Sequence, residues 1–122
     1  MEQSRNVVLD KSYAFAIRVV NAYKYLTESQ KEFVLSKQLL RSGTAIGALN
    51  REAVHAQSKA DFLNKMNIAL KEACETEYWL SLLYDTHYLE ENNYKSIVAD
   101  CKELVALLTS IVKTVKTDIN RK

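Results

Sequence analysis

Proline is absent from this 122-residue chain, and glycine occurs only at Gly43 and Gly47. Folds built from strands need many tight turns, and tight turns draw on glycine and proline. The scarcity of both residues therefore argues against an all-β or an α/β fold. It favours a few long helices that are joined by short polar connectors.

Long apolar runs are also missing. No window has the roughly 18 uncharged apolar residues that a membrane span requires, and the polar N-terminal sequence is unlike a secretory signal. A cytoplasmic protein is therefore expected, in which Cys74 and Cys101 are reduced. In antiparallel helices these two cysteines would lie roughly 10 Å apart along the axis. We therefore predict two buried thiols and no disulfide.

Four segments repeat apolar residues at the three- and four-residue spacing of a buried helical stripe. They cover residues 9–27, 31–56, 59–88 and 94–118. Short connectors make consecutive helices antiparallel neighbours. The predicted fold class is all-α, an antiparallel up-down-up-down four-helix bundle that forms a single domain over residues 1–122. The predicted core includes Leu39, Ile46, Phe62, Ala69, Leu80, Leu104, Leu108 and Ile111.

Residues that cap helix N-termini precede three of these segments. Ser29 is the candidate cap of the second helix, and Ser58, with Asp61 three residues later, that of the third. Either Asn92 or Asn93 is the candidate cap of the fourth.

The second helix contains both glycines, and each costs roughly 1 kcal/mol in a helix interior relative to alanine. Either the helix breaks there, or it continues because Gly43 and Gly47, one turn apart, let another backbone come close. The apolar stripe passes through the segment without a change of phase. A continuous helix is therefore favoured, with its close contact either inside the chain or between subunits.

Five strings stand out between residues 36 and 80: Ser36-Lys-Gln-Leu-Leu-Arg-Ser-Gly-Thr-Ala-Ile-Gly-Ala48, Arg51-Glu-Ala53, Gln57-Ser-Lys-Ala-Asp-Phe62, Ile68-Ala-Leu-Lys-Glu-Ala73 and Glu75-Thr-Glu-Tyr-Trp-Leu80. Together they resemble the bacterial four-helix-bundle family that includes proteins encoded in intervening sequences of 23S ribosomal RNA genes. The resemblance implies a bundle of this topology that assembles into a homopentameric ring. It also implies a more distant similarity to the accessory proteins of diversity-generating retroelements, which bind RNA and a reverse transcriptase.

One short stretch departs from the family's pattern. The family usually has Ser-Ile-Gly-Ala-Asn in the second helix, where this chain has Ala45-Ile-Gly-Ala-Leu49. A serine and an asparagine are therefore missing. If those polar groups serve a function, that function is lost or changed here.

No pattern of residues indicates catalysis. The segment from Gly43 to Gly47 lacks the glycine count and the preceding strand of a phosphate-binding loop. Glu52 and His55 have the Glu-x-x-His spacing of di-iron bundles, but Glu72 on the next helix lies roughly 12 Å away along the axis. We therefore predict no catalytic residue, no metal, no cofactor and no small-molecule substrate.

Four aromatic residues crowd the end of the third helix: Tyr78, Trp79, Tyr84 and Tyr88. Such residues form a half-buried rim of a core, contact another subunit, or stack on bases. Residues 72–103 contain eight acidic and two basic residues, a net charge of −6, which disfavours base stacking. The predicted oligomer-interface residues are Gly43, Gly47, Tyr78 and Trp79.

One end of such a bundle gathers the chain termini and the joint between the second and third helices. This end carries nine basic and five acidic residues, a net charge of +4, and a ring would repeat it once per subunit. Its candidate phosphate contacts are Arg51, Lys59, Lys113, Lys116 and Arg121. The leading functional hypothesis is a non-enzymatic oligomeric scaffold that associates with RNA or a ribonucleoprotein. The alternative is a protein-binding adaptor that uses the acidic, aromatic end.

Overall fold

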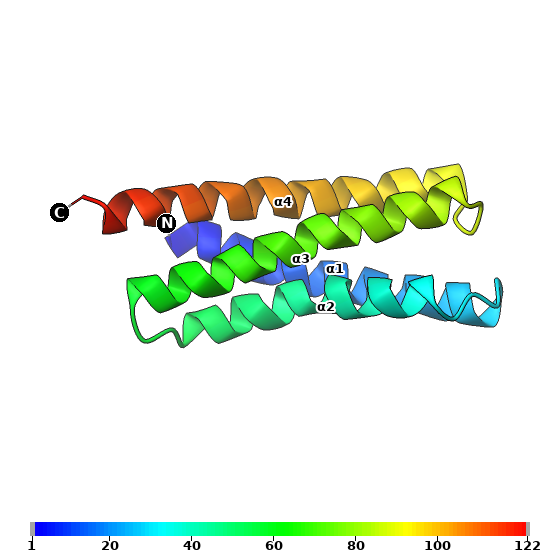
Figure 1. Cartoon of the computed structure of the whole chain (residues 1–122), viewed down its shortest axis with the longest axis horizontal. Helices are drawn as coiled ribbons and strands as arrows, with labels where there is room; N and C mark the ends of the chain where they lie inside the picture. The colour runs from blue at the N-terminus through cyan, green and yellow to red at the C-terminus, as the bar shows by residue number, and fades with distance from the viewer. Residues whose placement is uncertain (1, 122) are drawn as a thin grey trace.

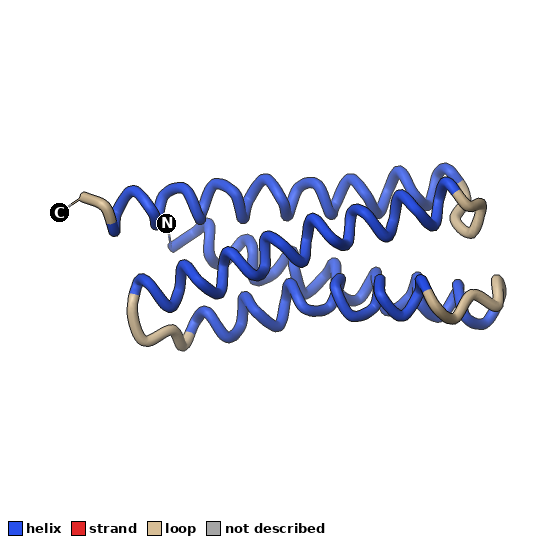
Figure 2. Tube along the Cα trace, viewed as in Figure 1, coloured by secondary structure: helices blue, strands red, loops and turns tan. Residues whose placement is uncertain are grey.

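The structure, a computed structural model, describes the backbone of residues 2–121 and the side chains of residues 6–121. Within residues 2–121 it contains four helices and no strand (Figures 1 and 2): α1 (Glu2–Glu28), α2 (Leu35–Val54), α3 (Lys59–Asp85) and α4 (Glu91–Ile119). Each helix packs against the next, and α4 packs back against α1. The predicted up-down-up-down bundle is confirmed. Both chain ends and the α2–α3 connector lie at one end of the bundle, and the other two connectors lie at the opposite end.

The core is a continuous apolar interior to which every helix contributes. All eight core residues predicted from the sequence are less than a tenth exposed, and Leu108 is fully buried. On α1, Phe15, Val19 and Leu26 are buried at the three- and four-residue spacing of an apolar stripe, while Ala22, on the same stripe, is only half-buried. The stripe also continues toward the N-terminus, where Val8 is 2% exposed. Burial of this stripe is what aligns the four helices.

The seam between α1 and α2 explains the two glycines. A Cβ at Gly43 would lie 2.7 and 2.8 Å from the two γ carbons of Val19, and a Cβ at Gly47 would lie 3.3 Å from the backbone oxygen of Ser12. The helix α1 therefore passes over α2 where a side chain has little room. The predicted continuous helix is confirmed, and this close contact lies inside the chain.

The start of α2 differs from the sequence prediction. The helix begins at Leu35 rather than near residue 31, and its N-terminus is capped by Glu32 and not by Ser29. The Glu32 carboxylate accepts hydrogen bonds from the backbone N–H groups of Val34, Leu35 and Ser36, at 3.2, 3.0 and 2.7 Å. Burial acts to raise the pKa of Glu32, but these hydrogen bonds together hold that pKa below its usual value. The sequence did not reveal this cap because glutamate is not a usual N-cap residue.

The α2–α3 connector agrees with the prediction. The Ser58 hydroxyl accepts a hydrogen bond from the backbone N–H of Asp61 at 3.0 Å, and the Asp61 carboxylate accepts one from the N–H of Gln57 at 3.1 Å. This reciprocal arrangement resembles a capping box. It fixes the point at which α3 begins, at Lys59.

The α3–α4 connector has the predicted length but lies three residues earlier, at residues 86–90 rather than 89–93. The helix α3 ends at Asp85, because His87 adopts a left-handed φ of 72° and the N–H of Tyr88 bonds back to the carbonyl of Leu83 at 2.9 Å. This is the backbone closure of a Schellman motif. The helix α4 then begins at Glu91, so the predicted caps Asn92 and Asn93 lie inside its first turn, and no side chain caps it.

Among the described residues, no helix combines the length and the apolar character that a membrane crossing demands.

Candidate nucleic-acid interface

The five predicted phosphate contacts all lie toward the end of the bundle that holds the chain termini (Figure 1). Arg51 is in the last turn of α2, Lys59 is the first residue of α3, and Lys113 and Lys116 are in the last turns of α4. Arg121 follows α4. All five side chains are exposed. The fold therefore brings them to one end, spread over three helices rather than at one point.

Two other basic residues of this end are neutralised by acids. Lys65 forms an ion pair with Glu52 at 3.2 Å across α2 and α3. Lys11 forms one with Glu103 at 3.2 Å across α1 and α4. These pairs reduce the number of cations that remain for an anionic partner.

The remaining cations differ in how they are held. Arg51 lies over the ring of Tyr13, with its guanidinium carbon 5.1 Å from the ring centroid, a cation–π contact. The other four, Lys59, Lys113, Lys116 and Arg121, form no ion pair with any residue whose side chain is described. Exposed, unpaired cations are the groups that phosphates bind most readily.

Helix geometry adds a structural role for some of these charges. The C-terminus of a helix carries a partial negative charge, which favours cations in its last turn. Arg51 and Lys116 occupy that position in α2 and α4. Both residues therefore stabilise their own helices as well as adding positive potential to this end.

Glu52 and His55, which have the spacing seen in di-iron bundles, are not joined by further metal ligands among the described residues. The Glu52 carboxylate forms an ion pair with Lys65, and His55 is the exposed residue that directly follows α2. In the part of the chain that the structure describes, no three His, Cys, Asp or Glu side chains converge as metal ligands.

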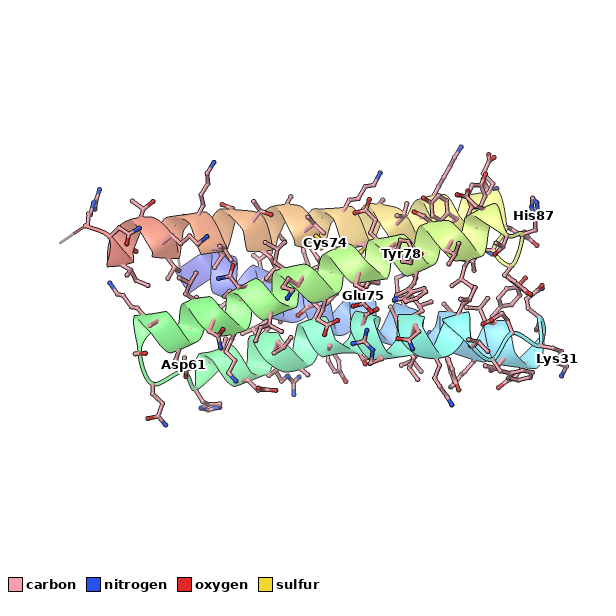
Figure 3. All side chains as sticks on the ribbon, viewed as in Figure 1. Lys31, Asp61, Cys74, Glu75, Tyr78 and His87 are labelled. Atoms are coloured by element: carbon pink, nitrogen blue, oxygen red, sulfur yellow. The ribbon has the colours of Figure 1, made fainter. Side chains whose placement is uncertain are left out.

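Both cysteines are free thiols, as predicted, but only one is buried. Cys101 is fully buried, and its Sγ–H donates to the carbonyl of Ala73 at 3.3 Å. Burial raises the pKa of Cys101 to about 12, so the thiol stays protonated at neutral pH. Cys74 is exposed on the outer face of α3 (Figure 3). The prediction that it is buried is wrong, because its position falls between the core-facing residues of α3.

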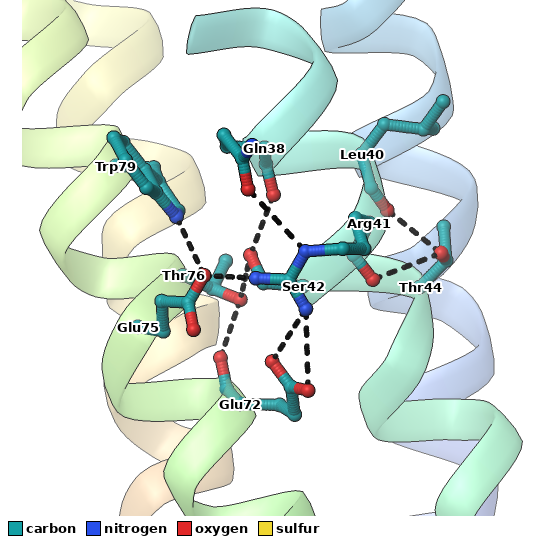
Figure 4. Close-up of polar contacts among 9 residues, drawn as sticks. All are labelled: Gln38, Leu40, Arg41, Ser42, Thr44, Glu72, Glu75, Thr76 and Trp79. Carbon is teal, nitrogen blue, oxygen red and sulfur yellow. Dashed lines mark hydrogen bonds and ion pairs between the residues drawn. The ribbon is translucent and has the colours of Figure 1, made fainter.

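Much of the acidic charge of α3 is used inside the chain (Figure 4). The guanidinium of Arg41 on α2 donates to both carboxylate oxygens of Glu72, at 3.2 and 3.3 Å, and also pairs with Glu75. The indole N–H of Trp79 donates to Glu75 at 2.9 Å. Nearby, the buried hydroxyl of Thr76 donates to that of Ser42 at 2.9 Å. This polar cluster joins α2 to α3.

The predicted aromatic cluster divides into internal and exposed parts. Tyr84 stacks on Tyr94 of α4 with ring centroids 4.3 Å apart, and Trp79 and Tyr88 pack half-buried against the core. Tyr78 is different, because it is 59% exposed and touches Trp79 edge to face. Tyr78 is therefore the member of the cluster that is free to contact a partner (Figure 3).

Comparison with known proteins places this geometry in a family. The 23S rRNA-intervening sequence protein family matches residues 4–110. The chain belongs to this family. A crystal structure of a family member from Bacteroides thetaiotaomicron VPI-5482, described as a protein of unknown function from the S23 ribosomal protein family, is 62% identical and superposes with a TM-score of 0.89. The match covers 90% of this chain and 98% of that one. No match is found among proteins of curated function.

The two positions at which this family member departs from the usual pattern lie on α2. Ala45 and Leu49 are both half-buried, and Leu49 packs against the core. Both positions, at which the resemblance implies polar residues, thus carry apolar side chains on the flank of the helix. The next residue, Asn50, is polar and is 2% exposed.

Several apolar residues of this chain are exposed at positions that the sequence did not predict to lie on the surface. On α1, Tyr13, Ile17 and Val20 are 55%, 49% and 36% exposed. In the α1–α2 connector, Phe33 and Val34 are 58% and 72% exposed. Apolar spacing gave only a weak signal for them, because α1 has apolar residues on its outer face as well as on its core face.

Proposed function

We propose that this chain is a non-catalytic homo-oligomeric scaffold that associates with RNA or a ribonucleoprotein through the end of the bundle holding its termini. The observation that carries the proposal is the gathering of four exposed cations at that end that form no ion pair with a described side chain: Lys59, Lys113, Lys116 and Arg121. The name of the family, which refers to intervening sequences of 23S rRNA, supports an RNA partner. Contacts of this kind would anchor phosphates without reading bases.

Self-association is supported by the exposed apolar surface. Tyr13, Ile17 and Val20 follow one another at helical spacing on α1, and on α3 Ile68 and Tyr78 are 37% and 59% exposed. The two helices α1 and α3 lie diagonally in the bundle, since each packs on α2 and α4 and not on the other. Two different surfaces on opposite sides suit a head-to-tail contact, which closes into a ring when the rotation allows. Five subunits is the number that the family resemblance favours.

Light scattering tests the oligomer. We expect a particle of about 70 kDa, which is five times the 14.0 kDa of the chain. Ile17→Glu places a charge in the α1 surface and should shift the mass toward the monomer, because burying an unpaired charge is costly. The matched control is Ala106→Glu, which adds the same charge to an exposed position of α4. A wild-type mass of about 14 kDa at micromolar concentrations would exclude self-association.

Charge reversal tests the RNA contact. Replacing Lys113 and Lys116 together by glutamate should weaken binding to a structured ribosomal RNA fragment by about tenfold or more at low salt, and should flatten the dependence of affinity on salt. The matched control is the double reversal of Lys24 and Lys37, two exposed lysines toward the opposite end. Fluorescence anisotropy across a salt series measures both effects. Equal losses in the two double variants, or no binding by the wild type, would show that the basic end is only a solvated surface.

A second candidate function is a protein-binding adaptor. It is favoured by Phe33 and Val34, two large apolar side chains that project from the α1–α2 connector. They lie at the end of the bundle that also holds the α3–α4 connector, where Lys31 and His87 are labelled in Figure 3. Adjacent exposed apolar residues of this kind are typical of contacts between proteins.

A further inference from the structure

A recess lies where three helices meet, near the end of the bundle that holds the chain termini. Its walls come from the start of α1, the last turns of α2 and the first turns of α3, and its volume is about 210 Å³. The lining residues are Asn6, Val8, Leu9, Asn50, Val54, Phe62 and Met66. Of these residues, five are apolar and two are asparagines, and none of the described side chains in the lining is charged, so the recess suits an uncharged occupant with apolar surface.

Asn50 gives the recess its chemical character. Its Nδ2 donates to the backbone carbonyl of Ile46 at 2.9 Å, and this bond fixes the orientation of the amide because a carbonyl oxygen can only accept. The other end of the amide, Oδ1, is the one buried side-chain polar atom without a partner in the part of the chain that the structure describes. A buried acceptor of this kind gains stability from any donor that reaches it.

We propose that this recess binds a neutral, planar, mostly apolar small molecule that carries one N–H or O–H donor for Asn50 Oδ1. Apolar cavities of about 150 Å³ hold benzene, so the recess has room for a somewhat larger ring system of about ten non-hydrogen atoms. The apolar walls, among them Phe62 and Met66, take the ring. Oδ1 is buried in the structure, so neighbouring side chains must shift before a donor reaches it.

This inference concerns a molecule that is bound and not converted, and it is independent of the proposed RNA association. It therefore does not conflict with the prediction that the chain has no small-molecule substrate. Failure of RNA binding would leave the recess unaffected, and an empty recess would leave the basic end unaffected.

Indole and benzothiophene test the proposal as a matched pair of probes. They have nearly the same shape, and only indole carries an N–H donor. Titration of the full chain, followed by the backbone amide signals of the lining residues in an NMR spectrum, should show that indole binds about three to ten times more tightly. Asn50→Leu should abolish this preference. Asn21→Leu, which changes an exposed asparagine in a separate recess between α1 and α4, should leave it intact.

A second variant keeps the proposal testable if Asn50→Leu fails to fold. Val54 is 60% exposed, so Val54→Trp should fill the mouth without disturbing the core and should weaken binding of both probes. Three results would overturn the proposal. They are equal affinity of the wild type for indole and benzothiophene, an indole preference that survives Asn50→Leu, and no binding of either probe at millimolar concentration.

Discussion

Truncating Leu108 to alanine should lower the free energy of unfolding by about 2–5 kcal/mol. Leu108 is fully buried in the middle of α4, where residues of the other helices surround it. The truncation removes the stabilisation that comes from burying the outer carbons. It also leaves a cavity that the neighbouring side chains fill only in part. A domain is stable by only about 5–15 kcal/mol, so this single change should remove a large share of the total.

Urea unfolding at a fixed protein concentration measures the loss, because any self-association makes the apparent stability depend on concentration. Leu107→Ala is the matched control, since Leu107 is the neighbouring leucine and is only half-buried. It should cost clearly less than Leu108→Ala. If both variants unfold at the same urea concentration, Leu108 does not occupy the buried position described here.

Replacing Gly43 by alanine should also destabilise the chain, although alanine is the better helix former by about 1 kcal/mol. The added methyl would lie 2.7 and 2.8 Å from the γ carbons of Val19, which is itself fully buried. Either the Val19 side chain or the α1 backbone must move. Overpacking of this kind costs typically about 1–3 kcal/mol, and we expect a net loss within that range.

A double-mutant cycle isolates the cause. Val19→Ala removes both γ carbons, so Gly43→Ala in that background should cost little or become favourable. Gly47→Ala is a graded comparison, because its methyl would meet the backbone oxygen of Ser12 at 3.3 Å, a milder contact. Stabilisation by Gly43→Ala in the wild type would contradict the close packing of α1 on α2.

The fold was predictable because its main determinant is the spacing of apolar residues. The stripe through Leu39 and Ile46 passes both glycines without a change of phase, and the structure has one continuous helix there. Helix ends were less predictable, since they depend on local hydrogen bonds with several solutions. Glu32 caps α2 from a position where sequence rules look for serine or aspartate, and the left-handed His87 ends α3 without a glycine.

Some features of the candidate sites were predictable from the sequence, and others were not. The position of each cation along the axis follows from helix order, so the grouping of Lys59 with Lys113 and Lys116 was predictable. Ion pairs across helices were not, because they depend on which faces meet. Lys11 with Glu103 is one such pair. The recess around Asn50 gave no sequence signal, since a polar residue on a helix is ordinarily exposed.

The central claim is that the chain is an oligomer that associates with RNA, and co-purification of the native protein before and after ribonuclease treatment tests it most directly. We predict that RNA accompanies the protein, that ribonuclease or high salt removes it, and that the remaining protein stays a multiple of 14.0 kDa. A single protein partner that stays bound after ribonuclease treatment, with no RNA before it, would contradict the claim. That result would favour the adaptor function and direct attention to Phe33 and Val34.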